Sequence, residues 1–492
     1  MKTCIIGGGL GGLAAAIVLR AQGVPVVLLE KNDQVGGKCN RISWEGFHFD
    51  TGPSLLTLPH VLDDLFRLAG RKREDYLEIV RLRPACRYFF PDGTRFDAPG
   101  DCEGFREGVK KTFPGEEEGF DRFMTYCERL WEISGPLFLF NRFGPSSLLK
   151  VSPLHALRGL GALRPWSLDR AVRHYFKDPR MIQLFNRYAT YNGSDPYRAP
   201  GTFNVISYVE MAYGSWHCLG GMYALVEALV RLAMELGVDV RTGVAAQSVT
   251  FSKRGDQVTG VTLADGTHCE TRRVIVNADA VGALTGPLLA AHPKAGRWQK
   301  RWAAREVSTS GYVLLLALNR MNPELACHNV FFSEDYPREF QQLFQTPAAL
   351  DKPTIYVSVP TKVDASQSPS GQEGWFVLVN APPLNRFTAW PSGYGDGLLR
   401  ALQRAGIGFD QSQLLWQEAL PPAFLRDRYA AWHGSIYGPA SNSRMDAFFR
   451  VANRGPARGL YFAGGSAHPG GGIPLALTSG RLAADSVVRD LK

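Results

Sequence analysis

The stretch Cys4–Gly12 reads CIIGGGLGG, and it decides the fold expected for the chain. An apolar β-type run precedes the glycines, and an Ala- and Leu-rich run, Leu13–Ala21, follows them. A second apolar run, Val26–Leu29, then ends at Glu30. This order predicts a strand, a tight turn, a helix and a second strand that ends in a carboxylate.

Gly7, Gly9 and Gly12 have the spacing G-x-G-x-x-G. In that pattern glycine permits a tight turn, a close approach of the backbone to a pyrophosphate, and packing of helix on strand. The phosphates then lie at the helix N-terminus, whose free N–H groups favour anions. Glu30 stands at the spacing of the group that accepts hydrogen bonds from an adenosine ribose. An ordinary glycine-rich turn could share the spacing, but the flanking strands and Glu30 favour a dinucleotide site.

Two other glycine-rich segments suit the same ligand. Gly36-Gly37-Lys38 follows the second strand, where the backbone can approach a phosphate again and Lys38 adds a positive charge, although a solvated loop also fits these residues. Near the C-terminus, Gly459–Ser466 (GLYFAGGS) and His468–Pro474 (HPGGGIP) predict a strand, a loop and a helix from about Pro474 to Val488. The N-terminus of that helix would suit an electron-rich flavin ring edge.

Together these motifs resemble the flavin amine oxidase and phytoene desaturase superfamily. Within it, the chain is most similar to the bacterial and fungal type of carotenoid desaturase. Besides the glycine-rich segments, the resemblance is carried by Phe49–Ser54 (FDTGPS), Val276–Asp279 (VNAD), Tyr191–Pro200 (YNGSDPYRAP) and Gly220–Leu225 (GGMYAL). It extends over essentially the whole chain, and the last two stretches point to the desaturase branch.

The resemblance implies FAD, held non-covalently by residues from both ends of the chain. Gly7, Gly9 and Gly12 would line the pyrophosphate, and Glu30 would hold the adenosine ribose. Further residues would complete the site: Gly37 and Lys38 at the phosphates, the backbone of Val244 at the adenine, and Ala463, Gly464, Gly465, Gly472, Ile473 and Pro474 around the flavin ring and pyrophosphate.

The expected fold is α/β, with a Rossmann-type FAD-binding lobe and a second mixed α/β substrate lobe that contains a helical membrane-contact region. We assign residues 1–85, 220–290 and 440–492 to the FAD lobe, and 86–219 and 291–439 to the substrate lobe. The middle piece of the FAD lobe predicts a helix over 220–237, a strand over Val238–Val244, a hairpin that turns at Asp265-Gly266, and a buried strand over Val274–Asn277.

Composition excludes several other classes of protein. The 492 residues are 45% hydrophobic and 21% charged, which is ordinary for a globular chain of more than one lobe. No apolar run approaches the roughly 18 residues that a spanning helix needs, and we expect no secretory leader before the first strand. Eight scattered cysteines without a C-x-x-C pair indicate reduced thiols in the cytoplasm, and the ten histidines show no metal-site spacing. We expect no metal and no nucleic acid.

One basic stretch favours contact with a membrane. The formal charge is +9, and residues Leu130–Arg173 interleave apolar and aromatic residues with arginine and lysine, with only Glu132 and Asp169 as acids. Broken helices of this composition suit an interfacial contact with anionic lipid, although an ordinary helical lobe has the same pattern. We therefore expect a cytoplasmic protein that associates peripherally with the membrane.

The resemblance implies double-bond insertion into a linear C30 or C40 polyene such as phytoene. That reaction transfers a hydride to the flavin and a proton to a base, in a dry and elongated cavity. Only one G-x-G-x-x-G occurs, so no second lobe for a nicotinamide reductant is expected, and the electrons would leave to quinone or oxygen. No Asp/Arg pair is found at Ser152–His155, and Glu210 near His217 suits a structural role, so the catalytic residues remain unassigned.

Two alternatives stay open. One changes the substrate: a later-step carotenoid dehydrogenase or oxygenase, a diapo-carotenoid desaturase, or an amine oxidase. The absence of a cysteine in Ser466-Ala467-His468 weakens the amine oxidase version, because some of those enzymes attach flavin through cysteine. The other alternative is a prenyl-binding escort protein like the Rab GDP-dissociation inhibitors, which share the fold without using flavin. The intact Gly7/Gly9/Gly12 pattern argues against it.

Overall fold

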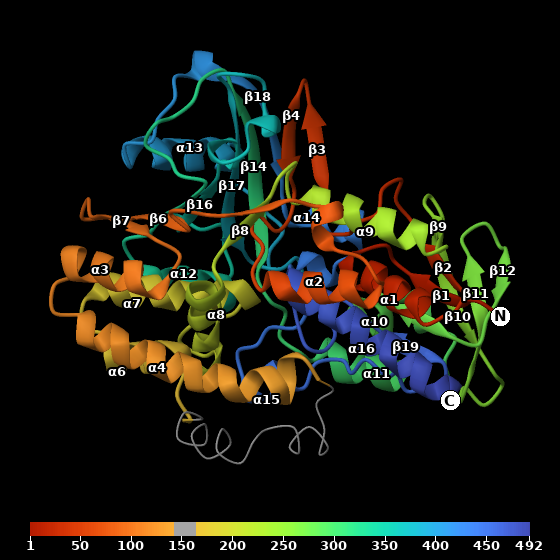
Figure 1. Cartoon of the computed structure of the whole chain (residues 1–492). Helices are drawn as coiled ribbons and strands as arrows, with labels where there is room; N and C mark the ends of the chain where they lie inside the picture. The colour runs from red at the N-terminus through yellow and green to blue at the C-terminus, as the bar shows by residue number, and fades with distance from the viewer. Residues whose placement is uncertain (142–163) are drawn as a thin grey trace.

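A computed structural model describes residues 1–141 and 164–492 (Figure 1). Its frame is a parallel sheet in the order β19-β13-β1-β2-β9, formed by β1 (Thr3–Ile6), β2 (Val26–Leu29), β9 (Asp239–Arg241), β13 (Val274–Val276) and β19 (Leu460–Phe462). β1 lies between β2 and β13, and β19 pairs with the outer side of β13. The N-terminal and C-terminal segments therefore meet in one sheet. β1, β13 and β19 are buried on both faces, as parallel sheets require.

The helix after the first glycine turn, α1 (Leu10–Ala21), is apolar on every side. Its residues from Leu10 to Leu19 are all buried, and its alanines and leucines favour a helix. Beyond its C-cap at Gln22, Gly23 has φ +77° and donates its N–H to the Arg20 carbonyl, while Val24 N–H donates to the Leu19 carbonyl. This pair of bonds is the glycine-terminated Schellman motif.

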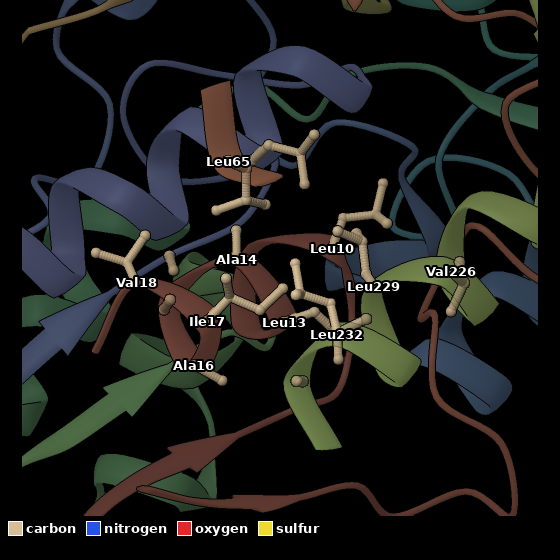
Figure 2. Close-up of a cluster of buried hydrophobic side chains, with 14 of the residues drawn as sticks. Leu10, Leu13, Ala14, Ala16, Ile17, Val18, Leu65, Val226, Leu229 and Leu232 are labelled. Carbon is tan, nitrogen blue, oxygen red and sulfur yellow. The ribbon is translucent and has the colours of Figure 1, made fainter. Parts of the chain in front are cut away.

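Helices on both sides bury α1. Leu10 and Leu13 point toward Leu229 and Leu232 of α9 (Tyr223–Glu235) in one apolar cluster (Figure 2). The same cluster includes Leu65 of α2 (Pro59–Leu68). On another side, α1 packs against the C-terminal helix α16 (Ile473–Leu491).

The contact between α1 and α16 is unusually close. A Cβ built on Gly480 of α16 would lie 2.1 Å from the Gly11 carbonyl oxygen and 2.9 Å from Ala14 Cβ. Only glycine at this position lets the two helix backbones approach so closely. The approach places Gly480, within α16, beside the start of α1.

Smaller antiparallel elements complete this lobe. β10 (Ala246–Phe251), β11 (Val258–Leu263) and β12 (His268–Glu270) form a meander, and β11 and β12 are joined through the predicted Asp265-Gly266 turn. Other pieces are the hairpin of β3 (Arg41–Trp44) and β4 (Phe47–Asp50), the pair of β5 (Ile79–Arg81) and β8 (Trp216–Cys218), and helices α10 (Ala280–Thr285) and α11 (Ala295–Ala303).

A large mixed sheet forms the upper part of the molecule in Figure 1. Its order is β18-β14-β17-β16-β15-β6-β7, with β6 (Cys86–Phe89), β7 (Arg95–Ala98), β14 (Ser310–Leu318), β15 (His328–Phe331), β16 (Ile355–Ser358), β17 (Glu373–Ala381) and β18 (Leu414–Leu420). All pairs are antiparallel except β15 with β6. The apolar run Val313–Leu318 lies in the buried strand β14.

Below this sheet in Figure 1 lie the helices α3 (Cys102–Thr112), α4 (Glu117–Ser134), α6 (Leu168–Tyr175), α7 (Pro179–Asn186), α8 (Val205–Tyr213) and α12 (Tyr336–Phe344). α13 (Tyr394–Arg404) lies in the upper part, where its leucines pack on strands of the sheet. Two further helices are α14 (Pro422–Tyr429) and α15 (Arg444–Phe448). A one-turn π-helix, Gly135–Leu139, continues α4, and a 3-10 helix, Arg187–Asn192, continues α7.

The predicted elements differ from the observed ones mainly at their ends. The helix of 220–237 covers Tyr223–Glu235, and the strand of 238–244 is only Asp239–Arg241, because Gly243 and Val244 leave the sheet to bond the carbonyls of Asn32 and Glu30. The strands of the parallel sheet come from all three segments assigned to the FAD lobe. The positions of the lobe boundaries themselves stay a prediction.

Replacing Gly480 with alanine is expected to lower the thermal unfolding midpoint, because the added Cβ overlaps the Gly11 carbonyl and must separate the helices. Overpacking of this kind costs about 1–3 kcal/mol. Gly296→Ala is the matched control: Gly296 lies on exposed α11, and a Cβ there meets nothing within 4 Å. The control should be neutral or slightly stabilising. Equal midpoints for the two variants would contradict the close α1–α16 contact.

Candidate active site

A cavity of about 810 Å³ runs between the glycine turns and the large mixed sheet. Its walls include both chain ends, from Gly7 and Gly9 at one end of the sequence to Gly472 and Pro474 at the other. They also include side chains from strands β14, β15 and β17 and from helix α8. The cavity therefore combines the predicted cofactor residues with parts of the predicted substrate lobe.

The first glycine turn is held in shape by Asn277. Gly7 has φ +101°, a conformation that favours glycine, and a Cβ there would lie 2.9 Å from the Asn277 carbonyl oxygen. Asn277 Nδ2 donates to the carbonyls of Gly7 at 3.0 Å and Gly9 at 3.3 Å. Gly12 does not line the cavity; a Cβ there would lie 2.2 Å from the Gly7 carbonyl oxygen, so this glycine allows α1 to pack on the turn.

Two helix N-termini open toward the cavity. α1 begins after Gly9 and α16 begins after Gly472, and neither glycine supplies a side chain to cap the free N–H groups. Free N–H groups and the positive end of the helix dipole attract phosphate and other electron-rich groups. The arrangement fits a ligand that carries phosphates at one position and an electron-rich ring at another.

Glu30 is buried at the end of β2, with 5% of its surface exposed, and lines the cavity. Its Oε2 accepts the Gly8 N–H at 2.8 Å, and its Oε1 accepts the Asn32 N–H at 2.9 Å and Asn32 Nδ2 at 3.0 Å. These donors hold the carboxylate rigidly beside the glycine turn. A carboxylate oxygen has further lone pairs, so a ribose hydroxyl can still donate to it.

Gly37 lines the cavity and approaches the first turn, since a Cβ there would lie 3.2 Å from Gly9 Cα. Lys38 also lines the cavity, but its Nζ donates to the carbonyls of Ser435 at 3.0 Å and Ile436 at 2.6 Å. Burial lowers the pKa of this ammonium, while the carboxylate of Asp279 acts in the opposite direction. Lys38 thus joins two distant segments of the chain, and its contact with phosphate stays a prediction.

Val244 lines the cavity, but its N–H donates to the Glu30 carbonyl at 2.8 Å. The expected contact with adenine is therefore left to its carbonyl and side chain, and it stays a prediction.

The C-terminal residues divide into cavity lining and support. Gly464, Gly465, Gly472, Ile473 and Pro474 line the cavity. Ala463 does not line it; this residue is fully buried and its N–H donates to the Val276 carbonyl at 3.0 Å, which continues the pairing of β19 with β13. Ala463 therefore positions the two glycines after it.

The rest of the cavity wall is largely apolar. It includes Phe203, Ile206 and Val209 near or on α8, and Val313, Val330, Phe376 and Leu378 on the large mixed sheet. Part of the stretch expected at the membrane also faces inward: Trp131, Phe138 and Leu139 line the cavity. Residues 142–163, with Ser152–His155, lie outside the described residues, so the membrane contact stays a prediction. Within the described ranges, no helix is both long and apolar enough to cross a bilayer.

Sequence reasoning missed a buried polar group of residues at the cavity wall. Arg187, 9% exposed, lies among the rings of Tyr88, Tyr188 and Tyr191, whose centroids are 5.1–5.3 Å from its Cζ. Glu210 accepts the hydroxyls of Tyr188 at 2.9 Å and Tyr191 at 2.8 Å, which agrees with the structural role expected for it. Only the motif beginning at Tyr191 marked this region in the sequence.

Two acidic residues near the cavity were also not predicted as site residues. Asp279 lines the cavity and caps α10 through Oδ1, which accepts the N–H groups of Val281 and Gly282 at 3.1 and 3.0 Å. Glu339 on α12 is 2% exposed, and its Oε2 accepts the Thr354 N–H at 3.0 Å and the Ser333 hydroxyl at 3.1 Å. Burial raises the pKa of Glu339 to about 7, because water no longer solvates its charged form.

The chain belongs to the family of flavin-containing amine oxidoreductases, whose model matches residues 10–488. A 4,4'-diapolycopene oxygenase from Methylomonas sp is 36% identical over 499 residues, which cover 100% of this chain and 99% of the relative. A 1-hydroxycarotenoid 3,4-desaturase from Flavobacterium sp. is 34% identical over 99% of both chains. The chain is thus an FAD-dependent oxidoreductase related to carotenoid desaturases and oxygenases.

Solved structures agree on the fold. Cyclohexylamine oxidase from Brevibacterium oxydans has a TM-score of 0.64 and 17% identity, and the match covers 100% of this chain and 99% of that one. A Rab GDI from Plasmodium falciparum has a TM-score of 0.57 and 11% identity over 99% and 97% of the two chains. At these identities the likeness concerns architecture alone. Function is therefore inferred from the residues of the site and from the relatives by sequence.

Glu30→Ala is expected to weaken FAD binding by about 10- to 100-fold, because it removes a ribose acceptor and leaves the Gly8 and Asn32 donors unpaired. The apparent Kd is measured by titrating the apoprotein with FAD and following flavin fluorescence. Glu270→Gln, on the exposed edge strand β12, serves as the control and should bind FAD like the native chain. Unchanged affinity in the Glu30 variant would remove that residue from the cofactor site.

Glu339 should make stability depend on pH. Between its ordinary pKa of 4.5 and about 7, the folded chain binds this proton more tightly than the unfolded chain, so the free energy of unfolding falls as pH rises. Glu339→Gln should reduce that fall by about 1–3 kcal/mol. Denaturant unfolding of both proteins at pH 5 and pH 8 checks this. A loss that is identical in the variant would contradict the raised pKa.

Proposed function

We propose that this protein oxidises the end region of a linear C30 or C40 carotenoid, at a step after the first desaturations of phytoene. The closely related sequences named for carotenoid oxidation act on diapolycopene and on a hydroxycarotenoid, and their matches span the whole chain. Double-bond insertion into phytoene itself, the leading interpretation of the sequence, is supported less well by these names.

The observation that carries the proposal is the single cavity that joins the glycine turns to an apolar interior. A polyene is a long hydrocarbon with little to offer a polar site, so it is held mainly by apolar contacts and shape. Phe203, Val313 and Leu378 are among the side chains that give such a surface.

FAD, when bound, supplies the hydride acceptor that removal of two hydrogens from a carbon–carbon bond requires. The protein's own residues bind, orient and exclude water. Glu30 and the starts of α1 and α16 would fix the cofactor, and the apolar wall would hold the polyene and keep water from it. No residue is assigned as the base that takes the proton.

We further propose that quinone or oxygen receives the electrons and that the protein takes its substrate from a membrane surface in the cytoplasm. The insolubility of a polyene supports the membrane contact, as does the basic and aromatic composition of the segment from Leu130 to Arg173.

The test is incubation of the FAD-loaded protein with liposomes that contain a linear C30 or C40 polyene, with a quinone or with ¹⁸O₂. The expected result is a new product by chromatography, with an absorption shift from altered conjugation. Incorporation of ¹⁸O identifies an oxygenase, and loss of two mass units without it identifies a desaturase. The Glu30→Ala variant without added excess FAD is the low-activity control.

Turnover of an aliphatic amine with every polyene left unchanged would overturn the proposal in favour of an amine oxidase. Failure of the purified protein to take up flavin, with retained polyene binding, would instead favour an escort protein of the same fold.

A further inference from the structure

Arg450 places a buried positive charge at the wall of the cavity. It follows α15, lines the cavity and is 9% exposed. Among the described residues no carboxylate lies within ion-pair distance of its guanidinium, and the nearby Asp446 pairs with Arg305 instead. Since a buried charge is costly without a counter-charge, an arginine left unpaired at a cavity wall points to an electron-rich ligand that enters the cavity.

The guanidinium of Arg450 has donors to spare. Two of its five N–H groups have acceptors: Nη1 donates to the Tyr437 carbonyl at 3.1 Å, and Nη2 donates to the Ser441 hydroxyl at 3.0 Å. Nε–H has no acceptor in the described part of the chain, yet Nε is not one of the enclosed atoms that lack a partner, so it retains accessible surface. Burial lowers the pKa of the group to about 10, which leaves it charged near neutral pH.

Arg450 is fixed against the loop that leads into α16. A Cβ built on Gly470 would lie 3.6 Å from Arg450 Nε, so no side chain separates this part of the loop from the guanidinium. The next residue, Val451, forms a β-bridge with Ala467, and its carbonyl accepts the His468 N–H at 2.8 Å. The side chain and the backbone of this segment are therefore both held at the C-terminal loop.

Close contacts between glycines continue from this loop to the start of the chain. A Cβ built on Gly465 would lie 3.4 Å from Gly471 Cα. A Cβ built on Gly11 would lie 2.7 Å from the backbone nitrogen of Gly464. The guanidinium is thus at the same end of the cavity as the glycine turns, on the side where α16 begins.

This position fits the flavin ring better than the phosphates. The start of α1 suits the phosphates, whereas the start of α16 suits the electron-rich ring, and Arg450 adds a full charge on the α16 side. A hydride brings two electrons and one proton to the neutral oxidised ring, so the ring gains one negative charge. A fixed cation in a site that excludes water stabilises such a charge.

We propose that Arg450 faces the flavin ring and stabilises the negative charge that the ring gains on reduction. The arginine thereby raises the midpoint potential of the bound cofactor and favours removal of a hydride from the substrate. The inference concerns the cofactor and goes beyond the proposed function, because it holds whichever compound supplies the hydride.

The test uses the FAD-loaded full chain and two measurements that need no substrate: the midpoint potential from a reductive dye titration, and sulfite binding followed by loss of flavin absorbance. Sulfite adds to the oxidised ring with its own electron pair and leaves one negative charge on the ring, so its affinity reports the same stabilisation. Arg450→Gln removes the charge but keeps a donor for the Tyr437 carbonyl. It should weaken sulfite binding about tenfold, and the same factor in a two-electron couple lowers the midpoint potential by about 30 mV.

Arg450→Lys keeps the charge and should hold the sulfite affinity within about threefold of the native value. Arg458→Gln is the matched control, because this arginine is exposed and does not line the cavity, and it should change neither measurement. If Arg450→Gln does not fold, the native chain still decides: its midpoint potential should exceed that of free FAD measured alongside.

Unchanged sulfite affinity and potential in Arg450→Gln would overturn the inference and leave the arginine as a link between Tyr437 and Ser441. Weaker FAD binding with both values unchanged would overturn it too, because the charge would then serve the phosphates. A native potential at or below that of free FAD would also contradict it. Failure to oxidise any polyene, with the expected sulfite and potential changes, would reject the proposed function alone.

Discussion

The site depends on the close contact of α1 with α16. Gly480 lets α16 approach the backbone of Gly11, and this contact packs the last helix against the start of the first one. Asn277 adds a second link, because its side chain bonds the carbonyls of Gly7 and Gly9. A bulkier residue at either contact would separate two helix ends that together attract an anionic, electron-rich ligand. The cofactor site is thus a product of packing between segments more than 450 residues apart in sequence.

Charge and burial then divide the cavity into regions of different chemistry. Near the glycine turns, Glu30 is held by backbone N–H groups, and Lys38 is held by two carbonyls. Much of the remaining wall is apolar, so it favours the binding of a hydrocarbon over that of water. Arg187, which also lines the cavity, is buried among aromatic rings. Polar groups at the glycine turns beside a largely apolar wall suit a flavin next to a hydrocarbon.

The fold alone does not separate an oxidase from an escort protein, since cyclohexylamine oxidase and a Rab GDI share it. On the cofactor side, an enzyme that uses flavin is favoured by the glycine turns, by Glu30 and by the uncapped starts of α1 and α16. On the substrate side, the relatives are named for carotenoid oxidation, and the wall residues of this chain provide an apolar surface.

The sequence by itself predicted the βαβ unit at Cys4–Glu30, because glycine spacing and apolar runs act locally. Its resemblance to a known superfamily implied FAD and a site formed by both chain ends, whose strands pair in one sheet. Most of the predicted cofactor residues line the cavity. Only the tertiary structure decided that Lys38 donates to the carbonyls of Ser435 and Ile436 and that the Val244 N–H donates to the Glu30 carbonyl. It also decided that Gly12 and Ala463 pack beneath the residues that line the cavity. It alone brought Arg187 and Tyr336 into the lining of one cavity, since the residues that bury them come from segments that no local pattern connects.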